Sequence, residues 1–308
     1  MIIGKHRVYV LAAAFLWGCI GVFFKELSAR GFEPIQIVLI RASVASLGLG
    51  LWLLITDKKA FRIRLKDIWC FFGTGVVSLL MLNWFFFRAI EEVGLAIAGV
   101  LLYTAPAIVT VLSVLLFKEK LKHSGWGILV MIIFGCALVS GVIGSVYGIR
   151  ISGILFGLGS GFGYALYSIF SRYALLRGYS PQTISFYTFL FCVLACIPFV
   201  MNTTINPDLQ INDPSIWLYS LALGFLGCLL PYWLYTKGLS GLTGAAASMT
   251  ATLEPIVAVL FGVILYNEAL AIWQIVGIVL VLGGIILLAK TSSVDEARRQ
   301  GDGSPYNL

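Results

Sequence analysis

Long, continuous runs of apolar residues alternate with short polar segments along the whole chain. A helix needs about 20 mostly apolar residues to cross the hydrocarbon core of a membrane. Because the runs are unbroken, they predict membrane helices and not the alternating strands of a barrel. Ten runs meet this criterion: residues 8–28, 34–56, 68–88, 94–117, 124–143, 151–174, 181–200, 215–236, 242–266 and 271–290. We therefore expect an all-α integral membrane protein with ten transmembrane helices.

The second half of the chain repeats special residues of the first half. Shifts of 147 and 149 residues match these pairs: Phe15 with Phe162, Trp17 with Tyr164, Lys25 with Arg172, Gly31 with Gly178, Pro34 with Pro181, Asn83 with Tyr232, Trp84 with Trp233, Pro106 with Pro255 and Glu119 with Glu268. Five helices is an odd number, so the second half must enter the membrane from the opposite side. We expect two inverted five-helix repeats, residues 1–147 and 148–290, and a disordered cytoplasmic tail at 291–308. Inverted repeats are typical of secondary transporters, which hold their substrate between the halves.

The composition supports lipid as the solvent of this chain. Hydrophobic residues make up 60% of it and charged residues only 11%, which leaves too little polar surface for a soluble domain of 308 residues. The first apolar run is also too long for the core of a cleaved signal peptide, and nine more runs follow it.

The net charge of +7 has a sidedness that argues against a nucleic-acid partner. If the N-terminus is cytoplasmic, sixteen of the 21 Lys and Arg residues fall in inner segments and four in outer ones, with Arg41 inside a span. The positive-inside rule then predicts a multi-pass protein of the cytoplasmic membrane with both termini in the cytoplasm.

The sequence carries no signature of an enzyme, a metal site or a cofactor site. Its two histidines lie at membrane edges, and no zinc-protease, nucleophile-elbow or nucleotide-binding motif is present. The glycines at 157, 159, 161 and 163 lie inside an apolar run, where spacings of four favour close helix packing. All six cysteines fall in predicted spans and are interpreted as packing residues.

Glu254 is the most informative single residue, because a carboxyl near the centre of a span must face protein or a water-filled cavity. Pro255 follows it, frees the carbonyl of Ala251 and predicts a kink. In the first half Pro106 repeats the kink, whereas Ala105 replaces the acid. Glu254 is either a substrate or proton site or a structural carboxyl bonded to a neighbouring helix.

Aromatic residues within the spans suggest a cavity for a flat or amphipathic solute. Trp17 and Tyr164 lie well inside their runs, at matched positions of the two halves. Aromatic rings with a polar tip suit such a pocket, although Trp and Tyr also anchor helices at the membrane interface.

Three basic residues are candidates for gating or for holding charge. Lys25 and Arg172 are matched and lie at opposite mouths, where they attract anionic groups or simply extend to the lipid headgroups. Arg41 lies deeper in its span, and its expected partners are backbone carbonyls or an acid such as Glu91 or Glu92.

These features together resemble the drug/metabolite transporter superfamily, in its EamA group, from residue 12 to residue 288. The resemblance rests on the five-plus-five repeat, the opening Trp17-Gly18, Arg41 in the second helix, and the helix endings from Pro106 to Glu119 and from Glu254 to Glu268. It implies a central cavity and, commonly, export of amino acids, other metabolites or toxic compounds. On that basis the substrate-binding candidates are Trp17, Asn83, Trp84, Tyr103, Tyr164, Tyr232 and Glu254, while Glu119 and Glu268 are structural caps or loop anchors.

The expected function is alternating-access transport of a small organic solute, outward across the cytoplasmic membrane. No cofactor is expected; proton coupling through Glu254 is one hypothesis for the driving force. An uncoupled facilitator or channel-like permease for similar solutes is the alternative, and the sequence leaves the substrate, the coupling ion and the oligomeric state open.

Overall fold

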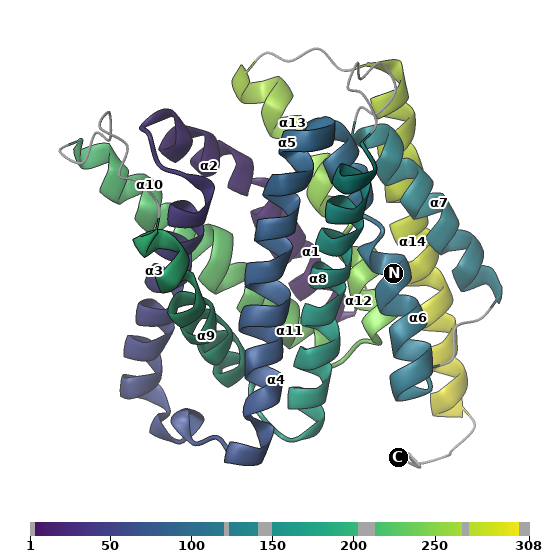
Figure 1. Ribbon diagram of the computed structural model, residues 1–308. Coiled ribbons are helices and arrows are strands. Elements are labelled where there is room, and N and C mark those ends of the chain that lie inside the picture. Colours follow the sequence, from purple (N-terminus) through teal and green to yellow (C-terminus); the bar gives the residue numbers. More distant parts are fainter. Residues whose placement is uncertain (1–3, 120–122, 141–149, 203–212, 267–270, 302–308) are drawn as a thin grey trace.

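A computed structural model of the protein describes residues 4–119, 123–140, 150–202, 213–266 and 271–301, which form helices and short connections without a strand (Figure 1). The first half contains α1 (Lys5–Gly18), α2 (Ile20–Ala29), α3 (Pro34–Thr56), η1 (Lys58–Phe61), η2 (Leu65–Asp67), α4 (Ile68–Phe72), η3 (Gly73–Leu80), α5 (Met81–Leu102), α6 (Ala105–Phe117) and α7 (His123–Val139). The second half contains α8 (Ile151–Leu176), α9 (Pro181–Met201), α10 (Pro214–Gly224), η4 (Phe225–Leu229), α11 (Leu230–Leu239), α12 (Gly244–Ala251), α13 (Leu253–Tyr266) and α14 (Ile272–Gly301).

Eight helical segments of the described chain are long and apolar enough to cross a membrane. They are Lys5–Ala29, Pro34–Thr56, Leu65–Leu95, Ile97–Phe117, Ile151–Leu176, Pro181–Met201, Pro214–Leu239 and Gly244–Leu265. Two shorter apolar helices, His123–Val139 and Ile272–Leu288, occupy the remaining two predicted runs. Helix α14 continues to Gly301, so it includes residues expected in the disordered tail, whereas residues 302–308 lie outside the described part.

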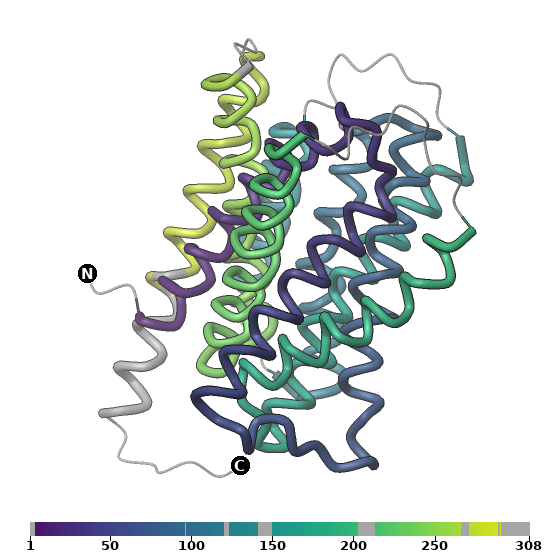
Figure 2. Tube along the Cα trace, turned by 90° about the vertical axis from the view of Figure 1, so that its left-hand side faces the viewer, coloured from purple at the N-terminus to yellow at the C-terminus, as the bar shows by residue number. Residues whose placement is uncertain are grey.

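The most extensive contacts between helices join the two halves of the chain. They pair α5 with α8, α7 with α14, α3 with α9 and α1 with α11. Most helices run side by side, and Figures 1 and 2 show that segments far apart in sequence, such as α7 and α14, lie next to each other. No half therefore encloses a core by itself, and the interior is shared between them.

The matched positions of the two halves adopt the same local structure. Helices α3 and α9 both begin with a proline, and the turn before each contains a glycine, Gly31 with φ 90° and Gly178 with φ 85°. A left-handed residue after a helix C-terminus favours glycine, which has no Cβ to clash. The π-helical segments η3 and η4 also lie at matched places, each within a membrane-spanning segment.

Helix α1 approaches α13 closely at Gly18. A Cβ there would lie 2.5 Å from the Val257 Cβ and 2.8 Å from the Glu254 carbonyl oxygen. Gly21, one turn further along, has no heavy atom within 4 Å of the place where its Cβ would lie. The crossing of α1 and α13 therefore depends on the missing side chain at Gly18.

We expect Gly18→Ala to lower the free energy of unfolding by about 1–3 kcal/mol, because it overpacks a close helix crossing. Gly21→Ala is the matched control and should leave stability unchanged or raise it slightly, since alanine favours a helix. Thermal unfolding of both purified variants in detergent measures the difference. Equal midpoints would contradict the close crossing.

Candidate functional site

A cavity of about 750 Å³ lies between the two halves and is lined by residues of α1, α2, α3, α5, α8, α11 and α13. It reaches the surface where Ala29 and Leu95 are exposed, an end that we call the mouth. Its wall is mostly apolar, and its charged lining residues are Lys25, Arg41 and Glu254. The aromatic lining consists of Trp17, Phe24, Phe86, Phe87, Tyr164 and Tyr232. Such a site suits a small amphipathic solute.

Packed aromatic rings form the floor of the cavity. The Trp17 ring centroid lies 5.1 Å from that of Tyr232, 5.3 Å from that of Tyr235 and 6.1 Å from that of Tyr164. Tyr167 packs edge-on against Tyr232 at 4.9 Å. Trp17 and Tyr164 are thus brought together from opposite halves, as expected of cavity residues and not of membrane-interface anchors.

Glu254 lies at the floor because the helix that carries it is interrupted. Helix α12 ends at Ala251, Thr252 donates its hydroxyl to the Met249 carbonyl at 2.6 Å, and α13 starts at Leu253. Glu254 is therefore in the first turn of α13, where the helix dipole favours a negative charge. The Tyr164 hydroxyl donates a hydrogen bond to its Oε2 at 3.1 Å.

The expected kinks at Pro106 and Pro255 are complete breaks between two helices. Pro106 is the second residue of α6, and Pro255 is the third residue of α13. A proline in a first helical turn lacks an N–H that would have had no partner within the helix, so it fits that position without cost. In both halves the interruption lies just before the proline for which the sequence predicts a kink, within one apolar span.

Arg41 is buried, with 8% of its surface exposed, and reaches the cavity from α3. Its Nη2 donates to Asn83 Oδ1 at 2.6 Å, and the Asn83 amide in turn donates to the Leu79 carbonyl at 2.6 Å. The acids expected as partners bond elsewhere: Glu91 accepts from Arg88 at 2.9 Å, and Glu92 accepts from Ser152. The prediction of Glu91 or Glu92 was therefore wrong, because Asn83 on the facing helix supplies a neutral acceptor.

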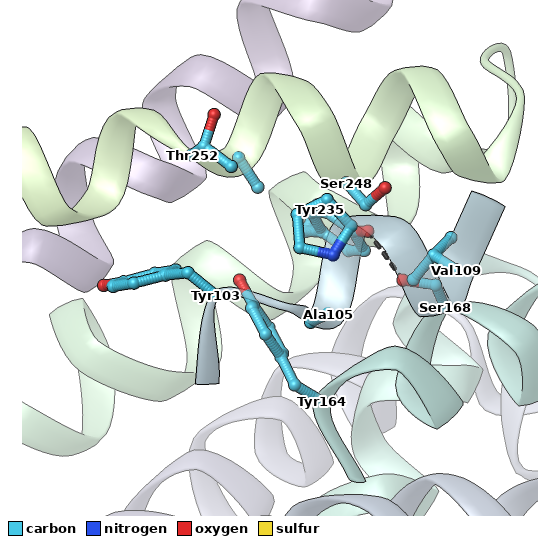
Figure 3. Close-up of a pocket in the computed structure, with 10 residues that line it drawn as sticks. Tyr103, Ala105, Val109, Tyr164, Ser168, Tyr235, Ser248 and Thr252 are labelled. Atoms are coloured by element: carbon cyan, nitrogen blue, oxygen red, sulfur yellow. Dashed lines mark hydrogen bonds between the residues drawn. The ribbon is translucent and has the colours of Figure 1, made fainter. Parts of the chain in front are cut away.

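Two other predicted substrate residues lie outside the main cavity. Trp84, the residue after Asn83, is 44% exposed on the outer face of α5. Its ring packs against those of Phe85 and Phe156. Tyr103 lines a much smaller pocket of about 10 Å³, which it shares with Tyr164, Ser168 and Tyr235 (Figure 3). The hydroxyls of Ser168 and Tyr235 form a hydrogen bond of 2.7 Å.

At the end opposite the mouth, Arg172 holds a polar group within the second half, and Glu119 joins that group to the first half. Arg172 donates to the carbonyls of Leu239 and Leu242 at 3.1 and 3.2 Å, and its Nη2 lies 3.9 Å from Glu119. Glu119 also accepts from the Gly244 N–H, at the start of α12, at 3.1 Å. These contacts close the end opposite the mouth. Glu268, the matched acid, lies outside the described residues.

The mouth itself is held by a second polar group. Arg30 donates to Asp213 at 2.9 Å and to Glu26 at 2.8 Å, which links the end of α2 to the start of α10. Ser215 donates its hydroxyl and its backbone N–H to Asp213, and these bonds, with Arg30, hold the pKa of this acid at about 2. Lys25, one turn before Ala29, lines the cavity near this end.

Several lining residues were absent from the predicted site. Phe24 lies seven residues after Trp17 and Tyr235 three after Tyr232, so both share a helix face with a predicted residue. Helical periodicity along those faces would have found them. Phe86 and Phe87 lie three and four residues after the predicted residue Asn83 on α5, so the same periodicity would have found them as well.

Comparison with known proteins identifies the family of this chain. The model of the EamA-like transporter family matches residues 6–141 and again residues 151–290. The chain belongs to the EamA-like transporter family. The resemblance to the drug/metabolite transporter superfamily is thereby confirmed, and the double match agrees with two repeats.

Relatives of this family member are named as transporters. The uncharacterized transporter YwfM of Bacillus subtilis is 26% identical to this chain, over 92% of this chain and 93% of YwfM. The uncharacterized transporter YxxF of the same organism is also 26% identical, over 93% of this chain and 88% of YxxF. The uncharacterized inner membrane transporter YicL of Salmonella typhimurium is 25% identical over 96% of this chain and 97% of its own. A crystal structure of a protein with 18% identity has a TM-score of 0.78 and covers 93% of this chain and 98% of that one, which shows a shared fold.

The Arg41–Asn83 contact gives a direct test of the site geometry. We expect Asn83→Leu to lower the free energy of unfolding by about 1.5–3 kcal/mol, since it removes the acceptor of a buried guanidinium. Asn83→Asp keeps that acceptor and loses only the amide donated to Leu79, so it should cost less. Denaturation of the two variants in detergent compares them, and an equal loss would contradict the role of the acceptor.

Proposed function

We propose that this EamA-family protein is a secondary transporter that moves small organic solutes, amino acids or related metabolites or toxic compounds, out of the cell by alternating access. One observation carries the proposal: the cavity is open at the mouth and sealed at the other end, with Glu254 on its floor. A carrier of this type exposes one binding site to one side of the membrane at a time. The transporter relatives favour this function over that of a membrane enzyme.

The proposed topology has ten spans in two inverted repeats. Eight described segments have the length and apolarity of a span, and the two shorter apolar helices α7 and α14 would complete five in each half. The helix pairs support a two-fold relation between the halves, because exchanging the halves maps the pair of α1 and α11 onto that of α8 and α5. The pair of α3 and α9 and the pair of α7 and α14 map onto themselves, and five spans in each half would make this relation an inversion, with the axis in the membrane plane.

The excess of basic residues in alternate loops supports the orientation. It would place both termini and the sealed end in the cytoplasm of a cell whose cytoplasmic membrane holds the protein. The mouth then faces outward, so the structure corresponds to the outward-facing state of the cycle. Export requires the sealed end to open and load substrate before the mouth releases it.

The lining suggests how a substrate would be held. The carboxylate of Glu254 would bind an amino group or a proton, Arg41 and Lys25 would attract an acidic group, and the rings of Trp17 and Tyr232 would pack on an apolar part. Proton coupling follows if Glu254 must give up its proton before the substrate amine binds. Trp84, on the outer face of α5, has no direct part in this scheme.

Uptake into sealed proteoliposomes tests the function. A pooled library of amino acids and metabolites is offered with and without an imposed pH gradient, for the wild type, Glu254→Gln and the control Glu91→Gln, which removes an exposed carboxylate outside the cavity. We expect saturable, gradient-driven uptake that falls about 10- to 100-fold in Glu254→Gln, the equivalent of a charge-assisted hydrogen bond of about 1.5–3 kcal/mol. Glu91→Gln should match the wild type.

Saturable uptake that needs no gradient and persists in Glu254→Gln would instead establish an uncoupled facilitator. Absence of saturable uptake for every pool, with folded protein in the liposomes, would contradict transport of these solute classes.

The sealed end makes a separate prediction about alternating access. We expect Arg172→Gln to favour the inward-open state, because it removes the cation that lies 3.9 Å from Glu119 of the first half. A cysteine introduced at Ser248, in the small pocket behind this end, should then react several-fold faster with a membrane-impermeant maleimide in inside-out vesicles. Lys66→Gln is the control, since it removes an exposed cation of η2, in the loop between α3 and α4. Equal rates in both variants would contradict a gate at Arg172.

A further inference from the structure

A second pocket, of about 330 Å³, lies where the segment between α3 and α4 meets the turn between α8 and α9. We call it the basic pocket, because four cationic side chains and one carboxylate line it. They are Lys59, Arg62, Arg64, Arg177 and Asp57. Both halves of the chain contribute to it, and it is separate from the transport cavity.

A buried acid builds the scaffold of the basic pocket. Asp67 is 2% exposed. Its carboxylate accepts hydrogen bonds from Arg64 Nε and from the Tyr179 hydroxyl, both at 2.7 Å. The same carboxylate lies 3.1 Å from Arg177 Nε. The backbone N–H of Arg64 donates to the same Tyr179 hydroxyl at 3.0 Å. The side-chain Nη2 of Arg64 donates to the Arg177 carbonyl at 3.2 Å. The loop is thus fixed on the turn before α9, and two guanidinium groups share one carboxylate.

The pocket therefore keeps an excess of positive charge. Lys59 and Arg62 line it, and neither side chain has an ion-pair partner in the part of the chain that the structure describes. The one lining carboxylate, Asp57, accepts from the Lys59 backbone N–H at 3.0 Å and caps η1. Ser180 and Thr183 add the N-terminal end of the 21-residue helix α9, a place that also favours an anion.

The position of the basic pocket indicates which anions can reach it. It lies at the end of the spans Pro34–Thr56 and Ile151–Leu176 and at the start of Pro181–Met201. The Arg177 guanidinium stacks over the ring of Trp69, which is exposed, at 4.9 Å. An exposed Trp at a span end is typical of the membrane–water boundary, where lipid phosphates lie.

We propose that the basic pocket binds a phosphate group, carried either by the headgroup of an anionic phospholipid or by a small soluble phosphate. Guanidinium groups recognise phosphate oxygens with paired hydrogen bonds, and the free charge of Lys59 and Arg62 balances the anion. Because the pocket joins the two halves, a bound phosphate also stabilises their contact at the sealed end.

Stability measurements on the full-length protein test this site. The wild type, Lys59→Gln/Arg62→Gln and the control Lys58→Gln/Lys66→Gln are placed in nanodiscs of phosphatidylcholine, with or without phosphatidylglycerol. Both double variants remove two charges from the same loop, but only the first pair lines the pocket. A further set in phosphatidylcholine alone receives inorganic phosphate, against chloride at the same ionic strength. Native mass spectrometry counts the phosphatidylglycerol molecules that stay bound.

We expect phosphatidylglycerol to raise the unfolding midpoint of the wild type and the control, and Lys59→Gln/Arg62→Gln to lose most of that gain and one bound lipid. A gain with inorganic phosphate that is lost in the same variant would assign the site to a soluble phosphate. Equal gains in the two double variants, or no gain from either phosphate source, would overturn the proposal. Equal midpoints of all three proteins in phosphatidylcholine alone confirm that the substitutions leave the fold intact.

Discussion

Hydrocarbon offers no hydrogen bonds, and the interior of this protein is arranged around that constraint. A polar group inside a lipid-facing bundle must find its partner within the protein or in water. Arg41 donates a hydrogen bond to Asn83, and Glu254 accepts one from Tyr164. At the helix break, the hydroxyl of Thr252 donates to the backbone carbonyl of Met249. Two of these three groups, the side chains of Arg41 and Glu254, line the cavity between the halves. The same requirement that makes buried charge rare thus concentrates it where a solute can enter.

Small residues on α8 allow close packing of this helix against the first half. On α8, a Cβ at Gly157 would lie 2.4 Å from Leu101, and one at Gly161 would lie 2.7 Å from the Thr104 hydroxyl. These glycines bring α8 against α5 and the start of α6, so that Tyr164 reaches Glu254 across the gap. Their interpretation as packing residues, and not as a nucleotide loop, is confirmed by these contacts.

The sequence predicts the helices well because apolar run length and charge patterning act locally. It also predicts Trp17, Tyr164 and Glu254 as cavity residues, since each is polar or aromatic deep within a span and the repeat marks its counterpart. Which side chains of a helix face the cavity was harder to predict. Asn83 and Trp84 are neighbours on α5 and point about 100° apart around the helix, so Asn83 meets the cavity while Trp84 faces outward. The partner of Arg41 depends on tertiary packing, which no local pattern records.

The paired π-helical segments have a consequence for the history of the chain. A π-turn arises when one residue is inserted into an α-helix, and η3 and η4 have it at equivalent places in the two halves. A single insertion in a gene that later duplicated explains both with one event. The difference between Ala105 and Glu254 is then younger than the insertion. With the inverted topology proposed above, the ancestral half-length protein would have paired with an inverted copy of itself, and the acidic floor would date from the time when the two copies could diverge.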